Sequence, residues 1–149
     1  MRNERYELKT NSDAMVYRFT SVGPKGNIPK IVIYQETTID NLYNLAFGDE
    51  NEEGNIDDTV ITNNDDSQKV LATVAETVYS FTFKNSNALI FAQGSTKART
   101  RLYRIGISNN LEEIMLDFDV FGFKDKELFP FEKNTEYDAF LVTRKKQDT

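Results

Sequence analysis

The sequence has 149 residues, contains no cysteine, histidine or tryptophan, and includes only three prolines. Without cysteine there are no disulfides, thiol nucleophiles or iron–sulfur ligands. Without histidine the usual zinc ligand and the usual general base at neutral pH are missing. Serine–histidine triads, cysteine–histidine dyads and zinc hydrolase chemistry are therefore excluded. Any catalysis would use Asp, Glu, Lys, Arg, Tyr, Ser or Thr side chains, and the sequence leaves open whether the protein is an enzyme.

Long apolar runs are missing as well. The longest are four or five residues, whereas a membrane-spanning helix needs about 20. Residues 1–13 are polar and charged and lack the apolar core of a signal peptide. The sequence therefore predicts a cytoplasmic protein with one domain over residues 1–149, whose last residues, 144–149, form a frayed tail.

Charge is unevenly distributed along the chain. The net charge is −6, and no lysine or arginine occurs between Ile31 and Gln68, a stretch rich in aspartate and glutamate. Residues 94–106 show the opposite pattern, because they hold basic residues and no acidic ones. This segregation favours a small anion, a protein partner or a second copy of the chain as the binding partner. The acidic balance disfavours nucleic acid. Neither a membrane nor a cofactor is expected.

Apolar alternation and turn residues predict several strands. Residues 15–20 and 28–35 read as a hairpin around Gly23-Pro24-Lys25-Gly26. Residues 88–92 form a continuous apolar run typical of a central strand. The remaining predicted strands are residues 6–9, 114–121 and 138–143, the last of which closes the sheet.

Apolar spacing of three and four residues predicts the helices. The clearest is residues 65–83, with Asp65 and Gln68 as a capping box. Shorter helices are expected at residues 38–47 and from Thr96 to about Gly106, the latter with Ala98, Leu102 and Ile105 on its inner face. The order β-β-β-α-α-β-α-β-β predicts an α+β fold, a mostly antiparallel sheet with about three helices packed on it. The expected core comprises Ile31, Ile33, Leu71, Val74, Val78, Leu89, Phe91, Leu102, Ile114, Leu116, Phe118 and Leu141.

The strongest candidate site is the strand-to-helix junction at residues 93–104. A helix N-terminus offers free N–H groups and a partial positive charge, and glycine lets a ligand approach the backbone. Basic and hydroxyl side chains follow at once, so the junction predicts a site for a phosphate or carboxylate. Its expected ligand-binding residues are Gly94, Ser95, Thr96, Lys97, Arg99, Arg101, Tyr103 and Arg104.

Within that site the residues would have different roles. Ser95 and the backbone would bind the anion, Arg101 or Arg99 would clamp it, and Lys97 would add a point charge. The alternative is structural: the basic residues neutralise the acidic stretch or form a solvated face, and Ser95 is an ordinary N-cap.

The acidic segment from Asp49 onward resembles a calcium loop in part. Asp49, Asn51 and Asp57 occupy ligand-like positions, but Val60 stands where a bidentate glutamate is required. The segment therefore predicts a solvated acidic loop or a loose hairpin, and no metal site.

Several short motifs carry a family resemblance over residues 4–122. The most specific is GSTxARTRLYR, from Gly94 to Arg104. On these motifs the chain resembles a bacterial family of small proteins catalogued only as a domain of unknown function. The resemblance supports one domain and cytosolic location, and it implies no activity.

The order of elements also looks like the acyl-CoA-dependent N-acetyltransferase fold, whose late helix carries a Leu-Tyr pair before a glycine. Leu102-Tyr103 and Gly106 match in kind, although the glycine follows the tyrosine by three positions instead of four. That family seats a pyrophosphate on a glycine-rich turn before the long helix, where this chain has Asn63-Asn64-Asp65-Asp66. The sequence therefore favours a binding or regulatory module with an anion site. The alternatives are an acetyltransferase-like enzyme and a protein-interaction subunit without a small-molecule site.

Overall fold

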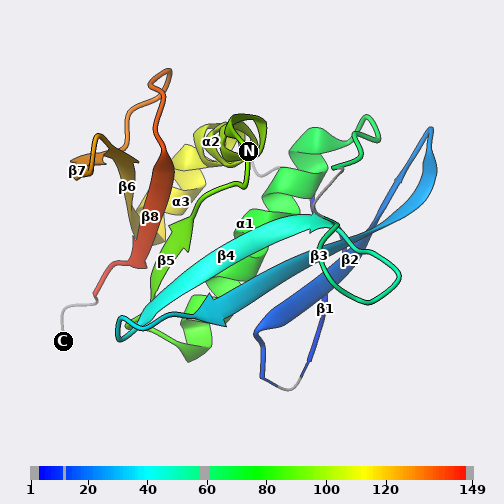
Figure 1. Cartoon of the computed structure of the whole chain (residues 1–149), viewed down its shortest axis with the longest axis horizontal. Helices are drawn as coiled ribbons and strands as arrows, with labels where there is room; N and C mark the ends of the chain where they lie inside the picture. The colour runs from blue at the N-terminus through cyan, green and yellow to red at the C-terminus, as the bar shows by residue number, and fades with distance from the viewer. Residues whose placement is uncertain (1–3, 12, 58–60, 147–149) are drawn as a thin grey trace.

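The computed structural model describes residues 4–11, 13–57 and 61–146. Its elements run along the chain as β1 (Lys9–Thr10), β2 (Val16–Gly23), β3 (Gly26–Glu36), β4 (Leu42–Asp49), α1 (Ser67–Lys84), β5 (Leu89–Ala92), α2 (Lys97–Asn109), α3 (Leu111–Asp117), β6 (Phe118–Lys124), β7 (Glu127–Pro130) and β8 (Ala139–Arg144). The strands form one sheet in the order β1-β2-β3-β4-β5-β8-β6-β7 (Figure 1). β4 and β5 are parallel, and the other pairs are antiparallel. The predicted α+β class, with three helices on a mostly antiparallel sheet, is confirmed.

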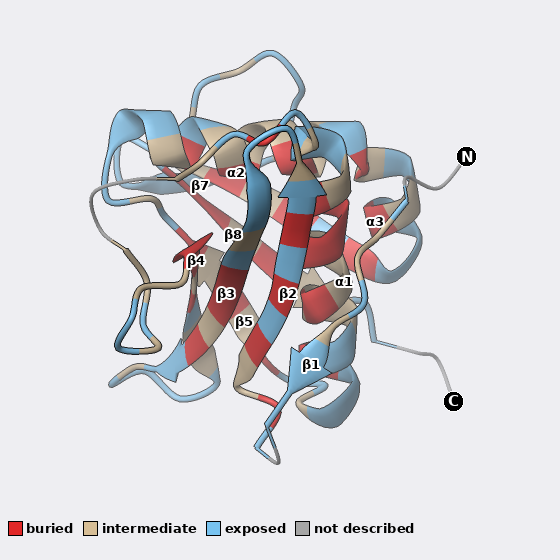
Figure 2. Cartoon of the chain, turned by 90° about the vertical axis from the view of Figure 1, so that its right-hand side faces the viewer, coloured by how far each residue is buried: buried red, intermediate tan, exposed pale blue. Residues whose placement is uncertain are grey.

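The β2–β3 hairpin has the predicted turn. Gly23 pairs with Gly26, so Pro24 and Lys25 form a two-residue loop. Gly26 has a φ of +92°, a conformation that glycine adopts without strain. Buried and exposed residues alternate along β2, as Figure 2 shows. The hairpin therefore turns one face toward the core.

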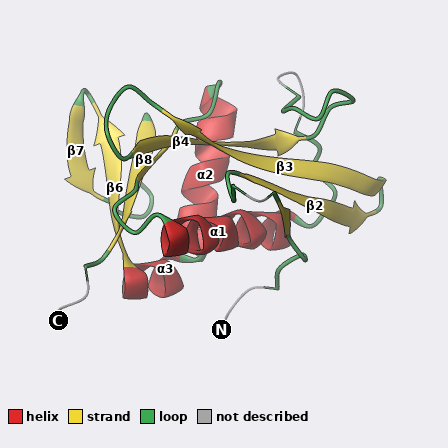
Figure 3. Ribbon diagram, turned by 90° about the horizontal axis from the view of Figure 1, so that it is seen from below, coloured by secondary structure: helices red, strands yellow, loops and turns green. Residues whose placement is uncertain are grey.

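Helix α1 packs on that face of the sheet. Phe81 stacks on Tyr34 of β3 with ring centroids 4.1 Å apart, and the Tyr34 hydroxyl lies 2.7 Å from Thr77 Oγ1. α1 and α3 lie on the same side of the sheet, and α2 crosses α1 (Figure 3). At that crossing Gly106 of α2 faces Leu71 of α1. The side chains between the helices and the sheet form the main core.

The helix predicted at residues 38–47 is wrong, because Leu42–Asp49 is a strand. β4 lies between β3 and β5, and apart from the exposed Asn44 the side chains on both of its faces are at least partly buried. A strand covered on both faces loses the apolar alternation that identifies an exposed strand. Its leucine and phenylalanine residues then recur at spacings that resemble a short helix.

The strand predicted from residue 114 begins too early. Residues 111–117 form α3, and β6 starts at Phe118. Ile114 and Phe118 are both buried, whereas Leu116 is 76% exposed. Ile114 and Phe118 are one helical turn apart, so their inward positions also fit alternation. Leu116 is therefore wrong as a core residue.

The chain ends also differ from prediction. β1 covers Lys9–Thr10 and not residues 6–9, because the Tyr6 N–H donates to Thr73 Oγ1 of α1 instead of a strand. β8 does not close the sheet, because it lies between β5 and β6, and β7 forms that edge. Arg144 is paired in β8 and donates to Thr82 Oγ1 and the Tyr79 carbonyl, so the predicted fraying does not begin at residue 144. Residues 147–149 of the predicted tail lie outside the described residues.

The rest of the predicted core is at least partly buried. Ile31, Leu71, Val74, Ile114 and Phe118 are buried outright. Among the helices of the described residues, none combines the length and the apolar character that crossing a membrane requires.

Candidate functional site

The predicted junction at the start of α2 uses its polar groups in hydrogen bonds within the junction. The Thr96 side chain caps the helix by accepting the Arg99 N–H at 3.2 Å. The Gly94 N–H donates to Thr100 Oγ1 at 3.1 Å. A Cβ on Gly94 would lie 2.4 Å from the Thr100 nitrogen. Glycine is therefore needed here for contact with the chain's own first helical turn.

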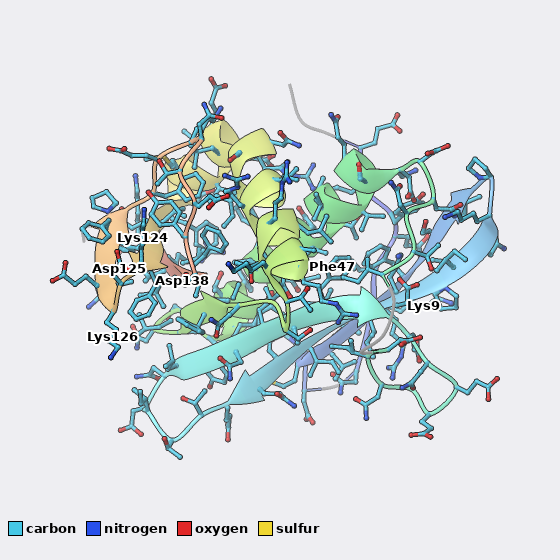
Figure 4. The ribbon with its side chains drawn as sticks, turned by 45° about the horizontal axis from the view of Figure 1, so that its top comes forward. Lys9, Phe47, Lys124, Asp125, Lys126 and Asp138 are labelled. Atoms are coloured by element: carbon cyan, nitrogen blue, oxygen red, sulfur yellow. The ribbon has the colours of Figure 1, made fainter. Side chains whose placement is uncertain are left out.

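The predicted ligand-binding side chains diverge from this junction. Arg99 donates to the Asp57 carbonyl at 3.0 Å, which ties α2 to the acidic segment. Arg104 points toward the Thr135 carbonyl, 3.5 Å away. Tyr103 is buried beside Phe47, which is labelled in Figure 4. Burial raises the pKa of Tyr103 to about 12, against the lowering effect of a hydrogen bond with the Phe47 backbone.

Only part of the predicted set remains available on the surface. Ser95, Thr96, Lys97 and Arg101 are exposed. Lys97 and Arg101 are one turn apart and share a face of the helix. The inner face of α2 also differs from prediction, because Thr100, Tyr103 and Gly106 are buried and Ala98 is exposed. Hydrogen bonds of a buried polar side chain and a close helix crossing set the rotation of α2 about its own axis. The spacing of apolar residues in the sequence detects neither feature.

The structure places a cavity of about 120 Å³ at the start of α1, which the sequence did not predict. β3, β4, the first turns of α1, α2 and the segment before α1 all contribute to its wall. The lining residues are Lys30, Phe47, Ile61, Thr62, Asn63, Asp66, Ser67, Val70, Leu71 and Leu102.

α1 begins without a side-chain cap. Asp66 stands at the N-cap position, but its carboxylate makes no cap hydrogen bond. It accepts instead from the Tyr6 hydroxyl and from Ser21 Oγ, each at 2.5 Å. Burial and the Asp66 carboxylate both raise the pKa of Tyr6. The predicted capping box of Asp65 and Gln68 is wrong, because the helix starts two residues after Asp65.

Asn64 explains why the segment before α1 turns toward the hairpin. It is 1% exposed. Its Oδ1 accepts the Lys25 N–H at 2.7 Å, and its Nδ2 donates to the Gly26 carbonyl at 2.9 Å. The polar side chains that would ordinarily cap the helix therefore bind β2 and β3. No side chain of the described residues therefore caps the first N–H groups of α1.

Lys30 is the buried cation of this region, with 1% of its surface exposed. Its Nζ donates to the Asp49 carboxylate and, at 2.8 Å, to the Thr62 carbonyl. The other Asp49 oxygen accepts the Thr62 N–H at 3.0 Å. An ammonium has three N–H donors. Within the part of the chain that the structure describes, the third donor of Lys30 has no protein acceptor.

The signal for Lys30 in the sequence is a lysine inside the apolar strand Ile28–Gln35. The strand pattern alone does not place Asp49 opposite this lysine. The β3–β4 register supplies that fact, since Lys30 pairs with Asp49. Long-range pairing of this kind is invisible to local patterns.

A second cavity, of about 60 Å³, lies between the three helices and the sheet. Its wall is almost entirely apolar and includes Leu71, Ala75, Ala92, Tyr103 and Gly106. Leu71 lines both cavities. The two cavities therefore share one lining side chain.

The acidic segment forms the loose hairpin that the sequence predicted. Glu50 and Ile56 make an antiparallel bridge, and Asn51 Oδ1 accepts the N–H groups of Glu53 and Asn55. Across residues 4–11, 13–57 and 61–146, no three carboxylates come together in a way that could hold a metal ion. Val60 lies outside the described residues.

Fold and cavities together define a small α+β domain with a cavity, lined by both polar and apolar residues, at the start of its longest helix. The chain belongs to a family of unknown function, DUF6934, whose sequence model matches residues 2–145. The family resemblance of the sequence is thereby confirmed. No curated protein and no solved structure matches the chain.

Proposed function

We propose that this protein is a binding module for a small anion, a phosphate or a carboxylate, held in the cavity at the start of α1. One observation carries the proposal: the uncapped first turn of an 18-residue helix opens beside a cavity that a buried lysine lines. Helix N–H groups and the macrodipole favour an anion, and the third N–H of Lys30 adds a charged donor.

The two neighbouring carboxylates differ in their effect on a bound anion. Asp49 is paired with Lys30 and the Thr62 N–H, and Asp66 accepts from Tyr6 and Ser21. Lys30 thus balances the charge of Asp49, whereas Asp66 keeps its negative charge and favours a singly charged ligand over a doubly charged one. At about 30 Å³ per water-sized group, the cavity has room for roughly four such groups, which suits a phosphate or a short carboxylate.

The junction at residues 93–104 is the competing location for the same anion. Its exposed Lys97 and Arg101 and the first turn of α2 would form a surface site. Arg99 is less suited to a direct clamp, because its guanidinium binds the Asp57 carbonyl. The two locations share no side chain, so substitutions separate them.

A thermal-shift titration with sodium phosphate and sodium acetate tests the proposal. A ligand at 100 times its Kd stabilises a fold by about 2.7 kcal/mol, which raises the Tm of a domain of this size by about 5 to 10 °C. Ser67→Asp places a carboxylate in the first turn of α1, where it favours the helix and repels an anion. We expect this variant to keep or raise its Tm and to lose the ligand response.

The matched control is Lys97→Ala/Arg101→Ala at the other helix start. It should respond to ligand as the parent does. A second variant, Lys30→Met/Asp49→Asn, removes the ion pair as a unit and keeps an acceptor for the Thr62 N–H, so no buried charge is left unpaired. It should also lose the response. A ligand-induced rise in Tm that persists in Ser67→Asp and disappears in the control would place the anion site at the start of α2 instead.

Acyl-CoA-dependent acetyl transfer is the second candidate. Two observations favour it: Leu102 and Tyr103 border the two cavities, and the start of α1 is open where the acetyltransferase family seats a pyrophosphate. The segment before α1 lacks the glycine-rich turn of that family. Release of free thiol from acetyl-CoA in the presence of amine substrates would support this candidate, and a Tyr103→Phe variant would test the tyrosine.

A further inference from the structure

We infer that this protein forms a reversible dimer, in which the helix-free face of the sheet packs against the same face of a second copy. The inference goes beyond the proposed function and does not depend on it, because the contact uses no residue that lines either cavity. It is carried by an apolar patch that no helix covers, by the area around that patch and by the shortness of the segments left to cover it.

The two faces of the sheet are identified by its core residues. Ile90 of β5 pairs with Val142 of β8, which pairs with Val120 of β6, and all three are buried in the core under the helices. Successive side chains of a strand point to opposite faces. The residues that alternate with these three therefore point to the other face, which we call the helix-free face. α1 and α3 both lie on the opposite side of the sheet (Figure 3).

The helix-free face carries apolar side chains. Phe91, Leu141 and Phe121 form one row across three neighbouring strands, because they pair in register. In the next row Phe123 pairs with Leu128 of the edge strand, which is 50% exposed. The rings of Phe91 and Phe123 join the two rows, with centroids 6.3 Å apart. An antiparallel sheet with one face in water ordinarily places polar residues there. The apolar patch comprises Leu89, Phe91, Phe121, Phe123, Leu128 and Leu141.

Charged groups border the apolar patch. Asp119 is exposed at the start of β6. At the other end of the face lies the acidic hairpin of residues 50–57, where Arg18 of β2 pairs with Glu50 at 3.0 Å. A Cβ on Gly48 would lie 2.8 Å from Ile56 Cγ2, so the hairpin covers this end of the face. Two hairpins of like charge repel each other, which favours a two-fold axis along the strands that keeps them at opposite ends.

The segments of this sequence outside the described residues are too short to cover the apolar patch. They are residues 1–3, 12, 58–60 and 147–149. The patch crosses β5, β8, β6 and β7, a width of about 19 Å at about 4.8 Å per strand. Three extended residues reach only about 10 Å. The cover must therefore come from outside this sequence.

A second copy fits the size and the character of the open surface. The part of the face from β4 to β7 has five strands about 4.8 Å apart and about 20 Å long, or about 480 Å². Two copies would together bury about 1,000 Å², which is near the lower limit of a specific interface. Each copy offers the other an apolar sheet face, and such faces pack about 10 Å apart. The small area predicts a dimer that dissociates on dilution.

Sedimentation equilibrium from about 1 μM to about 1 mM protein tests the dimer, because a weak interface dissociates within this range. We expect the average mass of the parent to rise from that of a monomer toward twice that value. Leu128→Lys/Leu141→Lys places charges in the apolar patch and should remain monomeric. The matched control is Leu116→Lys, because Leu116 is an exposed leucine of α3 on the other side of the sheet. The control should associate as the parent does.

A second measurement needs no variant. The methyl chemical shifts of Leu89, Leu128 and Leu141 in the parent should change with protein concentration, and those of Leu116 should not. A monomer at every concentration would overturn the inference and would leave the face to a different protein. A dimer that persists in the double variant, shown to be folded by circular dichroism, would also overturn it. So would concentration-dependent shifts confined to Leu116. None of these results bears on the anion site, which the ligand titrations test separately.

Discussion

Leu71 of α1 and Gly106 of α2 meet at the point where the two helices cross. A Cβ on Gly106 would lie 3.3 Å from both the Cβ and the Cδ2 of Leu71. Glycine thus permits a close crossing, and Leu71 is held between this contact and two cavities. The contact links helix packing to the candidate ligand site.

Gly106→Ala tests how freely Leu71 can move. Alanine gains up to about 1 kcal/mol over glycine in a helix interior. The new methyl group would press on Leu71, which has empty space beside it. We expect the free energy of unfolding, measured in urea, to stay the same or rise by up to about 1 kcal/mol. A loss of more than about 1 kcal/mol would mean that Leu71 cannot move aside.

Thr96→Ala tests the cap of α2. Loss of an N-cap hydroxyl costs about 1 kcal/mol. Ser95→Ala is the matched control, because Ser95 is exposed and makes no cap bond to the helix. Denaturant unfolding should therefore show a lower free energy of unfolding for Thr96→Ala and almost no change for Ser95→Ala. A larger loss for Ser95→Ala than for Thr96→Ala would instead identify Ser95 as the cap.

A pair of substitutions tests where α3 ends. Leu116→Ala should change stability by no more than about 0.5 kcal/mol, because Leu116 is 76% exposed. Phe118→Ala removes a fully buried side chain and should cost about 3 to 5 kcal/mol. Comparable losses at both positions would indicate the continuous strand that the sequence pattern predicted.

Stability at high pH should reflect the buried tyrosine of α2. Burial raises the pKa of Tyr103 from 10.0 to about 12. The unfolded chain therefore loses this proton first, so the contribution is complete below pH 10 and is lost between pH 10 and about 12. Tyr103→Phe has no such proton, and its free energy of unfolding should fall less than that of the parent over this interval. Equal losses of free energy of unfolding in the two proteins would mean that Tyr103 ionises as easily in the folded chain as in the unfolded chain. Tyr79, whose pKa is also raised to about 12, contributes equally to both proteins.

Much of the fold could be predicted from local patterns. The β2–β3 hairpin, α1, β5 and the start of α2 all follow from turn residues and periodicity. β4 could not be predicted in this way, because its burial on both faces depends on strands distant in sequence. α3 failed for another reason, since inward positions one helical turn apart also satisfy alternation.

The candidate site was harder to predict than the fold. The basic residues of α2 cluster in sequence, but Arg99 and Arg104 are directed to carbonyls of two different loops. The cavity at α1 depends on the pairing of Lys30 with Asp49 and on Asn64 binding the hairpin. Each contact joins residues far apart along the chain, so no local motif signals it.

The most direct test of the account is the position of the bound anion. Amide and methyl chemical shifts of the isotope-labelled protein should be followed during titration with butyrate. We predict that the largest changes occur at the amides of Ser67 to Lys69 and at the methyl groups of Leu71. Changes confined to residues 95–101, or no change at any residue, would contradict the account.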